Sequence, residues 1–209
     1  ETELFSVLFG LLPYTGEIKV NGKAVKLNCP KDSIKKNIAL IPEDRGLQGV
    51  SLTQSIKENI VMASLDKITS GPFISKAKEK EIVDRMIKSF SIKAESEETL
   101  VGTLSGGNQQ KVVFGKQLAT EPNIILMYDI TRGVDVGTKK DMFDTINENA
   151  KEGKGILFYS TEMEELVNVC NRIIVVNEGK IAGIIYSDEI SRENILRMSV
   201  GEDKKAKEG

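Results

Sequence analysis

The sequence contains no histidine, which excludes a histidine-based catalytic triad and any metal site with histidine ligands. Cysteine is nearly as scarce. Cys29 and Cys170 are the only two, and they lie too far apart to match metal-ligand spacing. We therefore expect reduced thiols, as in a cytosolic protein.

Long hydrophobic runs are missing too. The longest candidate, residues 4–12, is far shorter than the roughly 18 apolar residues of a membrane span, and it lacks the flanks of a signal peptide. A net charge of -2 gives no electrostatic reason to expect nucleic-acid binding. A chain of 209 residues, 40% hydrophobic and 29% charged, fits one globular domain, or a domain with a subdomain. Because it begins at Glu1 rather than Met, we expect a fragment.

Strand and helix patterns alternate along the chain. Apolar runs predict buried strands of a parallel sheet at 38–41, 123–129 and 155–160. Apolar and polar residues alternate on both sides of Asn21-Gly22, and this pattern predicts an antiparallel hairpin over 15–25. Further strands are expected at 172–176 and 180–186, and helices at 2–10, 51–64, 77–90, 136–152 and 191–200. This order predicts an α/β fold with a parallel sheet, a small antiparallel β lobe and an α-helical lobe.

Two connections in the helical lobe carry their own expectations. Residues 64–75, with Gly71-Pro72, are predicted to form a loop. Residues 93–99 are rich in charge, and we expect them to form a mobile linker.

The stretch Leu104–Lys111 organises the chemistry. Ser105 is a helix N-cap candidate, and Gly106 and Gly107 open the helix without a Cβ, so a ligand can approach the backbone. Unpaired N–H groups and the positive dipole end make such a helix start suitable for an anion. Taken alone, Ser-Gly-Gly is more commonly an ordinary loop before a surface helix. A buried stripe behind it is expected to hold the helix: Val112, Val113, Leu118 and Ala119.

As a whole, Leu104–Lys111 resembles the ABC signature in the form typical of sugar-importer ATPases, and we call it the signature segment. The strand Ile124–Met127 and the following Thr131–Gly137 resemble the strand and D-loop of that family. The resemblance runs from Glu1 to about Gly201 and is strongest to the second, C-terminal nucleotide-binding half of the ribose/galactose-type monosaccharide importer ATPases.

The resemblance implies an ABC-type ATPase fold, similar to P-loop NTPases. It implies one nucleotide-binding domain over residues 1–209 without its N-terminal phosphate loop, a helical and signature region at about 52–121, and a solvated tail at 203–209. The implied cofactors are ATP and Mg²⁺. The implied partners are a second ATPase half and transmembrane permease subunits, without nucleic acid, at the cytoplasmic face of the cell membrane.

In this family the signature completes the ATP site of the opposing half. The resemblance therefore implies that Ser105, Gly106, Gly107 and Gln109 contact ATP held by a partner. By position, Asp135 is the D-loop carboxylate that faces the opposing half.

The chain's own nucleotide site departs from the family pattern. Glu1 falls where the basic residue of the phosphate loop would lie, and Thr2 falls at the Mg²⁺-binding Ser/Thr; whether Glu1 is a real departure or the edge of a fragment stays open. Glu43 occupies the Q-loop position, where a glutamine senses Mg²⁺ and the γ-phosphate. A solvated charged turn is the alternative for the Glu43 segment.

At the end of the catalytic strand, alignment on Thr131-Arg132-Gly133 places Tyr128 at the family Asp and Asp129 at the catalytic Glu. A phenol cannot replace the carboxylate that holds water on Mg²⁺. Asp129 keeps a carboxylate for the attacking water but is one methylene shorter than Glu. A slipped register, with Asp129 at the Mg²⁺ position and Ile130 at the catalytic one, would need a bulge. Either register predicts a degraded site.

Thr161 occupies the switch position, where most relatives carry histidine. Its hydroxyl can bond a γ-phosphate but cannot carry positive charge. A helix N-cap role for Ser160-Thr161-Glu162 is the other interpretation.

These features predict an ATP-binding half of an ABC importer ATPase, with a signature that acts in trans and a degenerate site of its own. The isolated chain should be weak or inactive as an enzyme. The alternative is a non-hydrolysing, nucleotide-dependent structural or regulatory module. A third possibility, an ABC protein acting on DNA or ribosomes, is disfavoured by the acidic charge.

Overall fold

The computed structural model describes residues 2–200, which form two compact units that divide between Leu157 and Phe158. Each unit is described by itself. Glu1 and the expected tail at 203–209 lie outside the described residues.

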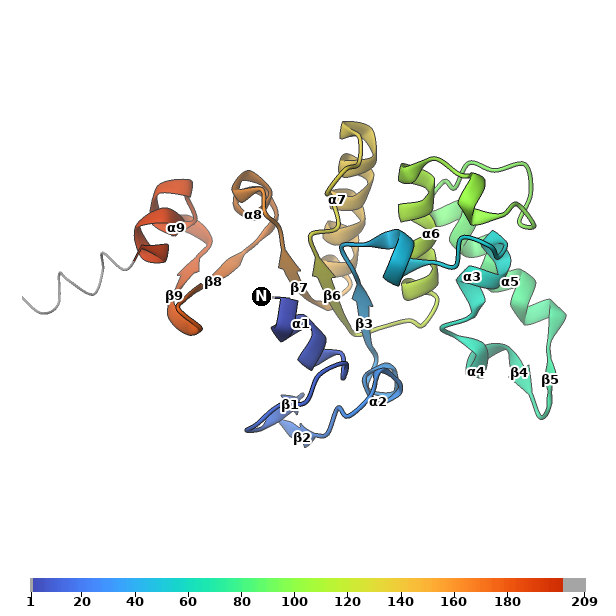
Figure 1. The fold of residues 1–209 in the computed structure, drawn as a ribbon, viewed down its shortest axis with the longest axis horizontal. Coiled ribbons are helices and arrows are strands. Elements are labelled where there is room, and N and C mark those ends of the chain that lie inside the picture. Colours follow the sequence, from blue (N-terminus) through green and yellow to red (C-terminus); the bar gives the residue numbers. More distant parts are fainter. Residues whose placement is uncertain (1, 201–209) are drawn as a thin grey trace, which may run out of the picture. The chain divides into compact units, whose positions relative to one another are not determined.

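A parallel sheet lies at the centre of the first unit (Figure 1). Strands β3 (Ile38–Ile41) and β6 (Ile124–Tyr128) pair in parallel, from Ile38 opposite Ile124 to Ile41 opposite Met127. The start of β7 (Gly155–Tyr159) follows β6 in the strand order β3-β6-β7. Ile41, Ile125 and Met127 are completely buried, as expected for apolar strands covered on both faces. The predicted parallel sheet is therefore confirmed.

Helix α1 (Thr2–Leu8) precedes a hairpin of β1 (Ile18–Val20) and β2 (Lys23–Val25). Asn21 and Gly22 join the two strands with φ values of 52° and 75°. Two successive positive φ angles are what a tight hairpin turn requires, so the prediction from Asn-Gly is confirmed. Helix α2 (Pro30–Lys35) was not predicted, although Pro30 at its first position is a known start signal.

The helical lobe lies between β3 and β6 in the chain. Its members are α3 (Ile56–Val61), α4 (Leu65–Ile68), α5 (Lys76–Ser89) and α6 (Gly106–Leu118). Helices α3, α5 and α6 pack on one another in the cyan and green part of Figure 1. Ile60, Val83 and Phe114 are almost completely buried among them. After β6, helix α7 (Val136–Lys151) leads to β7.

Two boundaries in this lobe correct the sequence prediction. The helix expected from residue 51 begins only at Ile56, because Ser55 and Glu58 form a capping box. The Glu58 N–H donates to Ser55 Oγ at 3.2 Å, and the Ser55 N–H donates to Glu58 Oε2 at 2.8 Å. The expected loop at 64–75 instead contains α4 and a small hairpin of β4 (Thr69–Ser70) and β5 (Phe73–Ile74).

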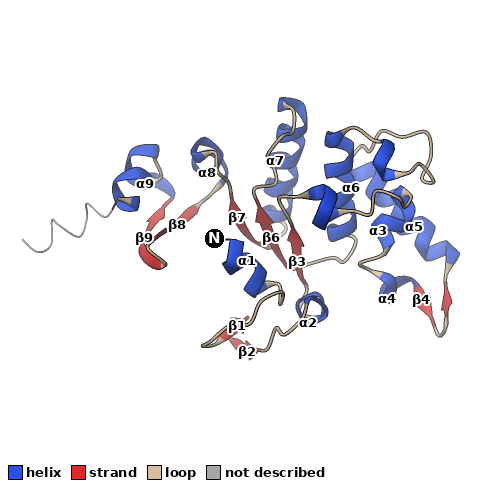
Figure 2. Ribbon diagram, viewed as in Figure 1, coloured by secondary structure: helices blue, strands red, loops and turns tan. Residues whose placement is uncertain are grey.

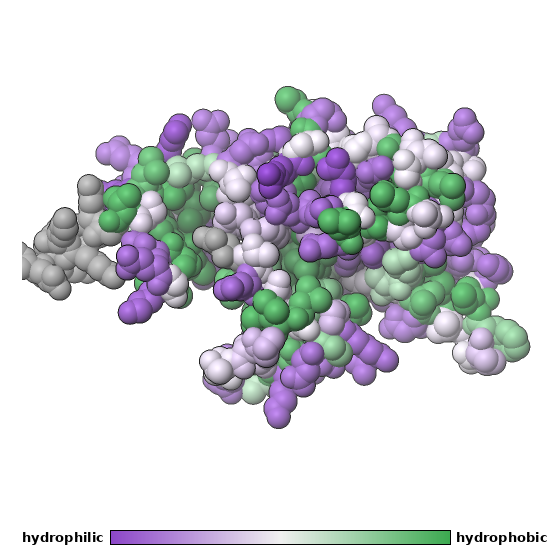
Figure 3. Space-filling view, in the orientation of Figure 1, coloured by the Kyte–Doolittle hydropathy of each residue, from purple (hydrophilic) through white to green (hydrophobic). Residues whose placement is uncertain are grey.

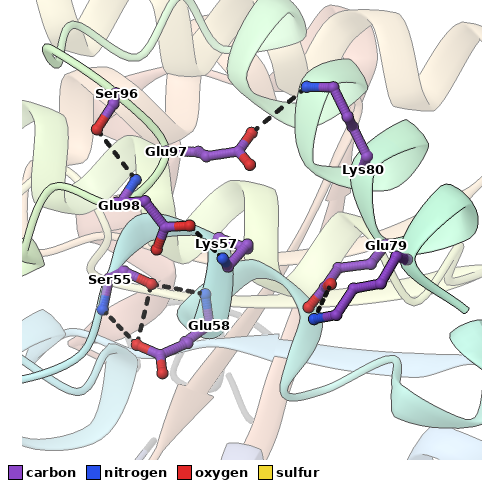
Figure 4. A network of polar contacts seen from close by, with 9 residues as sticks. Ser55, Lys57, Glu58, Glu79, Lys80, Ser96, Glu97 and Glu98 are labelled. Carbon is purple, nitrogen blue, oxygen red and sulfur yellow. Dashed lines mark hydrogen bonds and ion pairs between the residues drawn. The ribbon is translucent and has the colours of Figure 1, made fainter. Parts of the chain in front are cut away.

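The linker before the signature segment makes contacts that the sequence did not predict. Its backbone pairs with the start of α3: the N–H groups of Ile56 and Lys57 donate to the carbonyls of Thr99 and Glu97, each at 3.0 Å. Figure 4 shows Lys57 paired with Glu98, and Lys80 with Glu97. Backbone bonds and ion pairs thus contact this charged segment, and the mobility expected for 93–99 stays a prediction.

The second unit is a hairpin covered by two helices. Strands β8 (Arg172–Asn177) and β9 (Lys180–Tyr186) pair antiparallel, with α8 (Met163–Val169) before them and α9 (Arg192–Ser199) after them (Figure 2). Their buried core consists of Ile173, Val175, Ile185 and Ile195. The predicted strands and closing helix are present.

Across residues 2–200, none of the helices has the length and apolar character needed to cross a membrane. Hydrophilic and apolar side chains are interspersed over the face drawn in Figure 3.

Candidate functional site

The signature segment places an exposed helix start at Ser105. The Asn108 N–H donates to Ser105 Oγ at 3.4 Å, and Asn108 Nδ2 donates to the same oxygen at 3.1 Å. The first N–H groups of a helix have no acceptor within that helix, and the helix dipole adds positive potential there. Ser105 therefore lies where its hydroxyl and the first turn of α6 can meet an anionic group.

Gly106 and Gly107 also lie close to side chains of other elements of the chain. A Cβ at Gly106 would lie 2.7 Å from Arg45 Nη2, and a Cβ at Gly107 would lie 2.8 Å from Thr138 Oγ1. Both distances are too short for any larger residue unless these side chains move. Sequence reasoning assigned the two glycines to ligand approach alone; the structure adds a packing requirement on each side of the helix start.

The side chain of Gln109 turns back onto the segment before the helix. Its Nε2 donates to the carbonyls of Val101 and Leu104, at 3.3 and 3.1 Å. These residues belong to or follow the short turn η2 (Val101–Thr103). The side-chain amide of Gln109 therefore fixes the backbone segment that precedes Ser105, and its side-chain oxygen has no part in these two bonds.

Asp135 caps helix α7. Its carboxylate accepts hydrogen bonds from the Thr138 N–H at 3.0 Å and from the Thr138 hydroxyl at 2.7 Å. These bonds to Thr138, side chain first, lower the pKa of the Asp135 carboxyl and favour its ionised form. Because Thr138 is also the neighbour of Gly107, it joins the predicted D-loop carboxylate to the signature segment of the same chain.

Glu43 lies in a hollow of about 440 Å³ at the end of β3. Its carboxylate pairs with the guanidinium of Arg132. The hollow brings the predicted Q-loop position and the signature residue Gln109 to one place. Its lining residues are Glu43, Asp44, Arg45, Gly46, Gln109 and Arg132.

Thr2 and Tyr128 meet at the end of β6. Thr2 Oγ1 and the Tyr128 hydroxyl are 2.6 Å apart, a hydrogen bond in which either can donate. The Tyr128 ring also packs edge-to-face on Phe5 of α1, with ring centroids 5.2 Å apart and an interplanar angle of 62°. The structure thus joins the two positions that the resemblance gives to Mg²⁺ ligation, but one of them carries a phenol instead of a carboxylate.

Asp129 follows directly and is only 3% exposed. Its φ of 47° lies in the left-handed region, which Asp tolerates better than most residues. The β3–β6 ladder runs to Met127 without a register shift, so it gives no support to the slipped alternative, which needs a bulge. Ile130, the next residue, is buried.

Thr161 belongs to the second unit, and its position is described within that unit only. Its neighbour Ser160 fixes the turn: Ser160 Oγ accepts from the Glu162 N–H at 2.9 Å and donates to Glu165 Oε2 at 2.6 Å. Glu162, not Ser160 or Thr161, is the N-cap residue of α8.

The residues predicted for Mg²⁺ do not make a ready cation site. Thr2 is bonded to Tyr128 and Glu43 to Arg132. In the part of the chain from 2 to 200, no three Asp, Glu, Cys or His side chains cluster as metal ligands. Mg²⁺ would need oxygen ligands, which this pair of positions supplies only through a hydroxyl and an ion-paired carboxylate.

Comparison with known proteins settles the family. Residues 2–132 match the family model described as ABC transporter. The chain belongs to the ABC transporter family. It is 40% identical over 201 residues to the ribose import ATP-binding protein RbsA of Geobacillus kaustophilus, covering 96% of this chain and 41% of that protein. RbsA of Caldanaerobacter subterraneus is 40% identical over 202 residues, with 96% and 41% covered. The chain thus spans about two fifths of the length of these relatives.

Solved structures of the ABC transporter family share the fold. The ADP conformation of an ATP-binding cassette matches with a TM-score of 0.76 over 96% of this chain and 83% of that one. At 20% identity this likeness speaks for the fold alone. The predicted ABC-type α/β fold is confirmed.

Sequence reasoning missed three residues that border these ABC motifs: Arg45, Arg132 and Thr138. Thr138 had a local signal, because it lies three residues after the N-cap Asp135. Arg45 and Arg132 had none, since their contacts with Gly106 and Glu43 join residues far apart in the chain.

Proposed function

We propose that this chain is one ATP-binding half, the second, of an ABC importer ATPase that powers uptake of a monosaccharide or a similar small solute. Membership of the ABC transporter family supports it, as does the likeness to proteins named for ribose import. In this proposal residues 1–209 belong to one nucleotide-binding domain. Its partners are a second ATPase half and transmembrane permease subunits at the cytoplasmic face of the membrane.

The two nucleotide-contacting regions of this half have different tasks in the proposal. Ser105, Gly106 and Gly107 hold the terminal phosphate of ATP bound by the other half, bordered by Gln109 and Asp135. The exposed helix start at Ser105 supports this role, because it offers a hydroxyl and unpaired N–H groups to an anion. ATP with Mg²⁺, when bound, supplies the phosphoryl group that is transferred to water.

The chain's own site is degenerate in the proposal. The observation that carries this is the hydrogen bond between Tyr128 and Thr2, where the family places a carboxylate beside a Mg²⁺-binding hydroxyl. Asp129 keeps the catalytic carboxylate position with a shorter side chain, a misplacement of roughly 1 Å that can lower a rate about a hundredfold. Glu43 and Thr161 remain candidates for weak contacts with nucleotide there, and Thr2 and Glu43 for weak contacts with Mg²⁺.

Steady-state ATPase assays on the full-length protein that carries this chain test the asymmetry. Ser105→Arg should lower turnover by at least about a hundredfold, since it blocks the trans contact with phosphate. Asp129→Asn should change turnover less than about threefold, because the other site supplies the activity. Ser70→Arg, the same replacement on exposed β4, is the control and should leave turnover unchanged. If Ser105→Arg leaves turnover intact while Asp129→Asn abolishes it, the asymmetric assignment is wrong.

The second candidate is a nucleotide-dependent structural or regulatory module that does not hydrolyse ATP. The contacts of Tyr128 with α1 favour this candidate. The phenol bonds to Thr2 and the ring packs on Phe5, so the residues of the site contact one another without a ligand. Calorimetric titration of the purified chain with ATP separates a ligand-binding module from a purely structural one. Binding in the micromolar range would argue against the purely structural role.

A further inference from the structure

Lys116 lies on α6, three turns beyond Ser105, and has no role in the proposed chemistry. Its Nζ donates to the carbonyl of Gly49 at 2.7 Å. Burial of this side chain lowers the pKa of its ammonium group. Within residues 2–200, no carboxylate lies in ion-pair range of Lys116. Burying a cation whose only partner is a carbonyl costs free energy of folding. If Lys116 served only to fill space, an apolar side chain would destabilise the fold less.

The backbone at Gly49 packs closely on the face of α6 that carries Lys116. A Cβ at Gly49 would lie 2.7 Å from Val113 Cγ2, so only glycine allows this approach. Val113 and Lys116 are three residues apart and therefore share one helix face. Gly49 thus approaches Val113 closely, and its carbonyl accepts a hydrogen bond from the Lys116 ammonium group.

Gly49 ends a tightly bonded turn that starts directly after Glu43. In η1 (Arg45–Gly49), Asp44 Oδ1 accepts from the N–H groups of Gly46 and Leu47, each at 2.9 Å, and the Val50 N–H donates to the Arg45 carbonyl at 2.9 Å. The backbone N–H groups of this turn bond to acceptors within the turn. A hydrogen bond that fixes Gly49 therefore restrains the whole turn. At the other end of the turn, Arg45 lies against Gly106, the first residue of α6.

We propose that Lys116 is a positioning residue, which fastens the turn after Glu43 to the signature helix so that the two move as one body. The turn then contacts α6 at its first residue and again three turns later. Any displacement of Glu43 by a ligand would shift Ser105 as well. This consequence for turnover rests on the proposed function, whereas the fastening itself does not.

Hydrogen exchange of the 209-residue chain tests the fastening. In Lys116→Met, amides 46–50 should exchange at least about tenfold faster, because a charged hydrogen bond is lost at the end of the turn. Amides 124–128 of β6 should not change. Lys116→Arg, which can still donate to the carbonyl, should stay within about twofold of the unaltered chain. Lys88→Met, the same change at an exposed position of α5, is the control.

Unchanged exchange at 46–50 in Lys116→Met, or an equal rise in 46–50 and in β6, would overturn the proposal. If Lys116→Met does not fold, NMR of the lysine ammonium groups in the unaltered chain decides the matter. One ammonium signal, assigned to Lys116 by its loss in Lys116→Arg, should be protected from exchange with water; absence of any protected signal also overturns the proposal. These measurements need no nucleotide. Their outcome is therefore independent of the ATPase assay on Ser105→Arg, and failure of the proposed function can be distinguished from failure of this inference.

Discussion

The hydrogen bond between Thr2 and Tyr128 can be tested by its contribution to stability. Thr2→Val keeps the shape of the side chain and removes its hydroxyl. Tyr128→Phe keeps the ring on Phe5 and removes the phenol hydroxyl. If this hydrogen bond, seen at 2.6 Å, forms in solution, each change should destabilise the chain by a similar amount, and the double variant by little more.

The magnitude follows from the surroundings of the bond. A neutral hydrogen bond contributes about 0.5–1.5 kcal/mol to folding, and an exposed one belongs in the lower half of that range. We therefore expect each single change to cost about 0.5–1 kcal/mol, with a coupling of similar size. Tyr128→Leu also removes the edge-to-face contact with Phe5, which adds about 0.5–1.5 kcal/mol beyond the area lost.

Urea unfolding of the unaltered chain, both single variants and the double variant measures these terms. Tyr14 offers a matched control, because its hydroxyl bonds the Val25 carbonyl at 3.3 Å and not Thr2. Tyr14→Phe and Thr2→Val should therefore add without coupling. A coupling between Thr2 and Tyr128 below about 0.2 kcal/mol would show that the bond does not hold α1 to β6 in solution.

Two further predictions concern buried groups. Asn59 is completely buried; its side-chain oxygen accepts from the Ser51 N–H at 2.8 Å, and its Nδ2 donates to the carbonyls of Ser51 and Ser55, each at 2.9 Å. Both carbonyls also accept a backbone N–H, so Asn59→Leu removes the acceptor of the Ser51 N–H alone and should cost about 1–3 kcal/mol in urea unfolding; a cost below about 0.5 kcal/mol would contradict the network. Burial raises the pKa of the Cys170 thiol to about 11, so at pH 8 only about one thiol in a thousand is ionised. Iodoacetamide should therefore modify Cys170 about a hundredfold more slowly than exposed Cys29, as followed by mass spectrometry; equal rates would show that Cys170 is accessible.

Features encoded by neighbouring residues could be predicted from the sequence. The turn at Asn21-Gly22 needs two positive φ angles and has the residues that adopt them. The apolar run at 124–128 is typical of a strand buried on both faces, and Ser105 before two glycines is a helix N-cap candidate at the start of α6. In each case the deciding interactions lie within a few residues, so local propensity and the fold agree.

Contacts between distant segments could not be predicted in this way. The charge of residues 93–99 suggests mobility, but the hydrogen bonds from the N–H groups of Ile56 and Lys57 to the carbonyls of Thr99 and Glu97 come from a distant segment. The packing reasons for Gly106 and Gly107 depend on Arg45 and Thr138, which approach from other elements. The resemblance predicted that Tyr128 departs from the family pattern, but the sequence did not predict its contacts with Thr2 and Phe5.

The contacts of Tyr128 also explain how one site can change while the signature is preserved. Tyr128 bonds to α1, whereas the start of α6 is bounded by Arg45 of η1 and Thr138 of α7. Exchanging a carboxylate for an aromatic ring on β6 therefore alters contacts with α1 and leaves the neighbours of Ser105 as they are. Under the proposed function, the trans contact at the signature then has no structural reason to weaken when the chain's own site does, and we expect the two to respond independently to mutation.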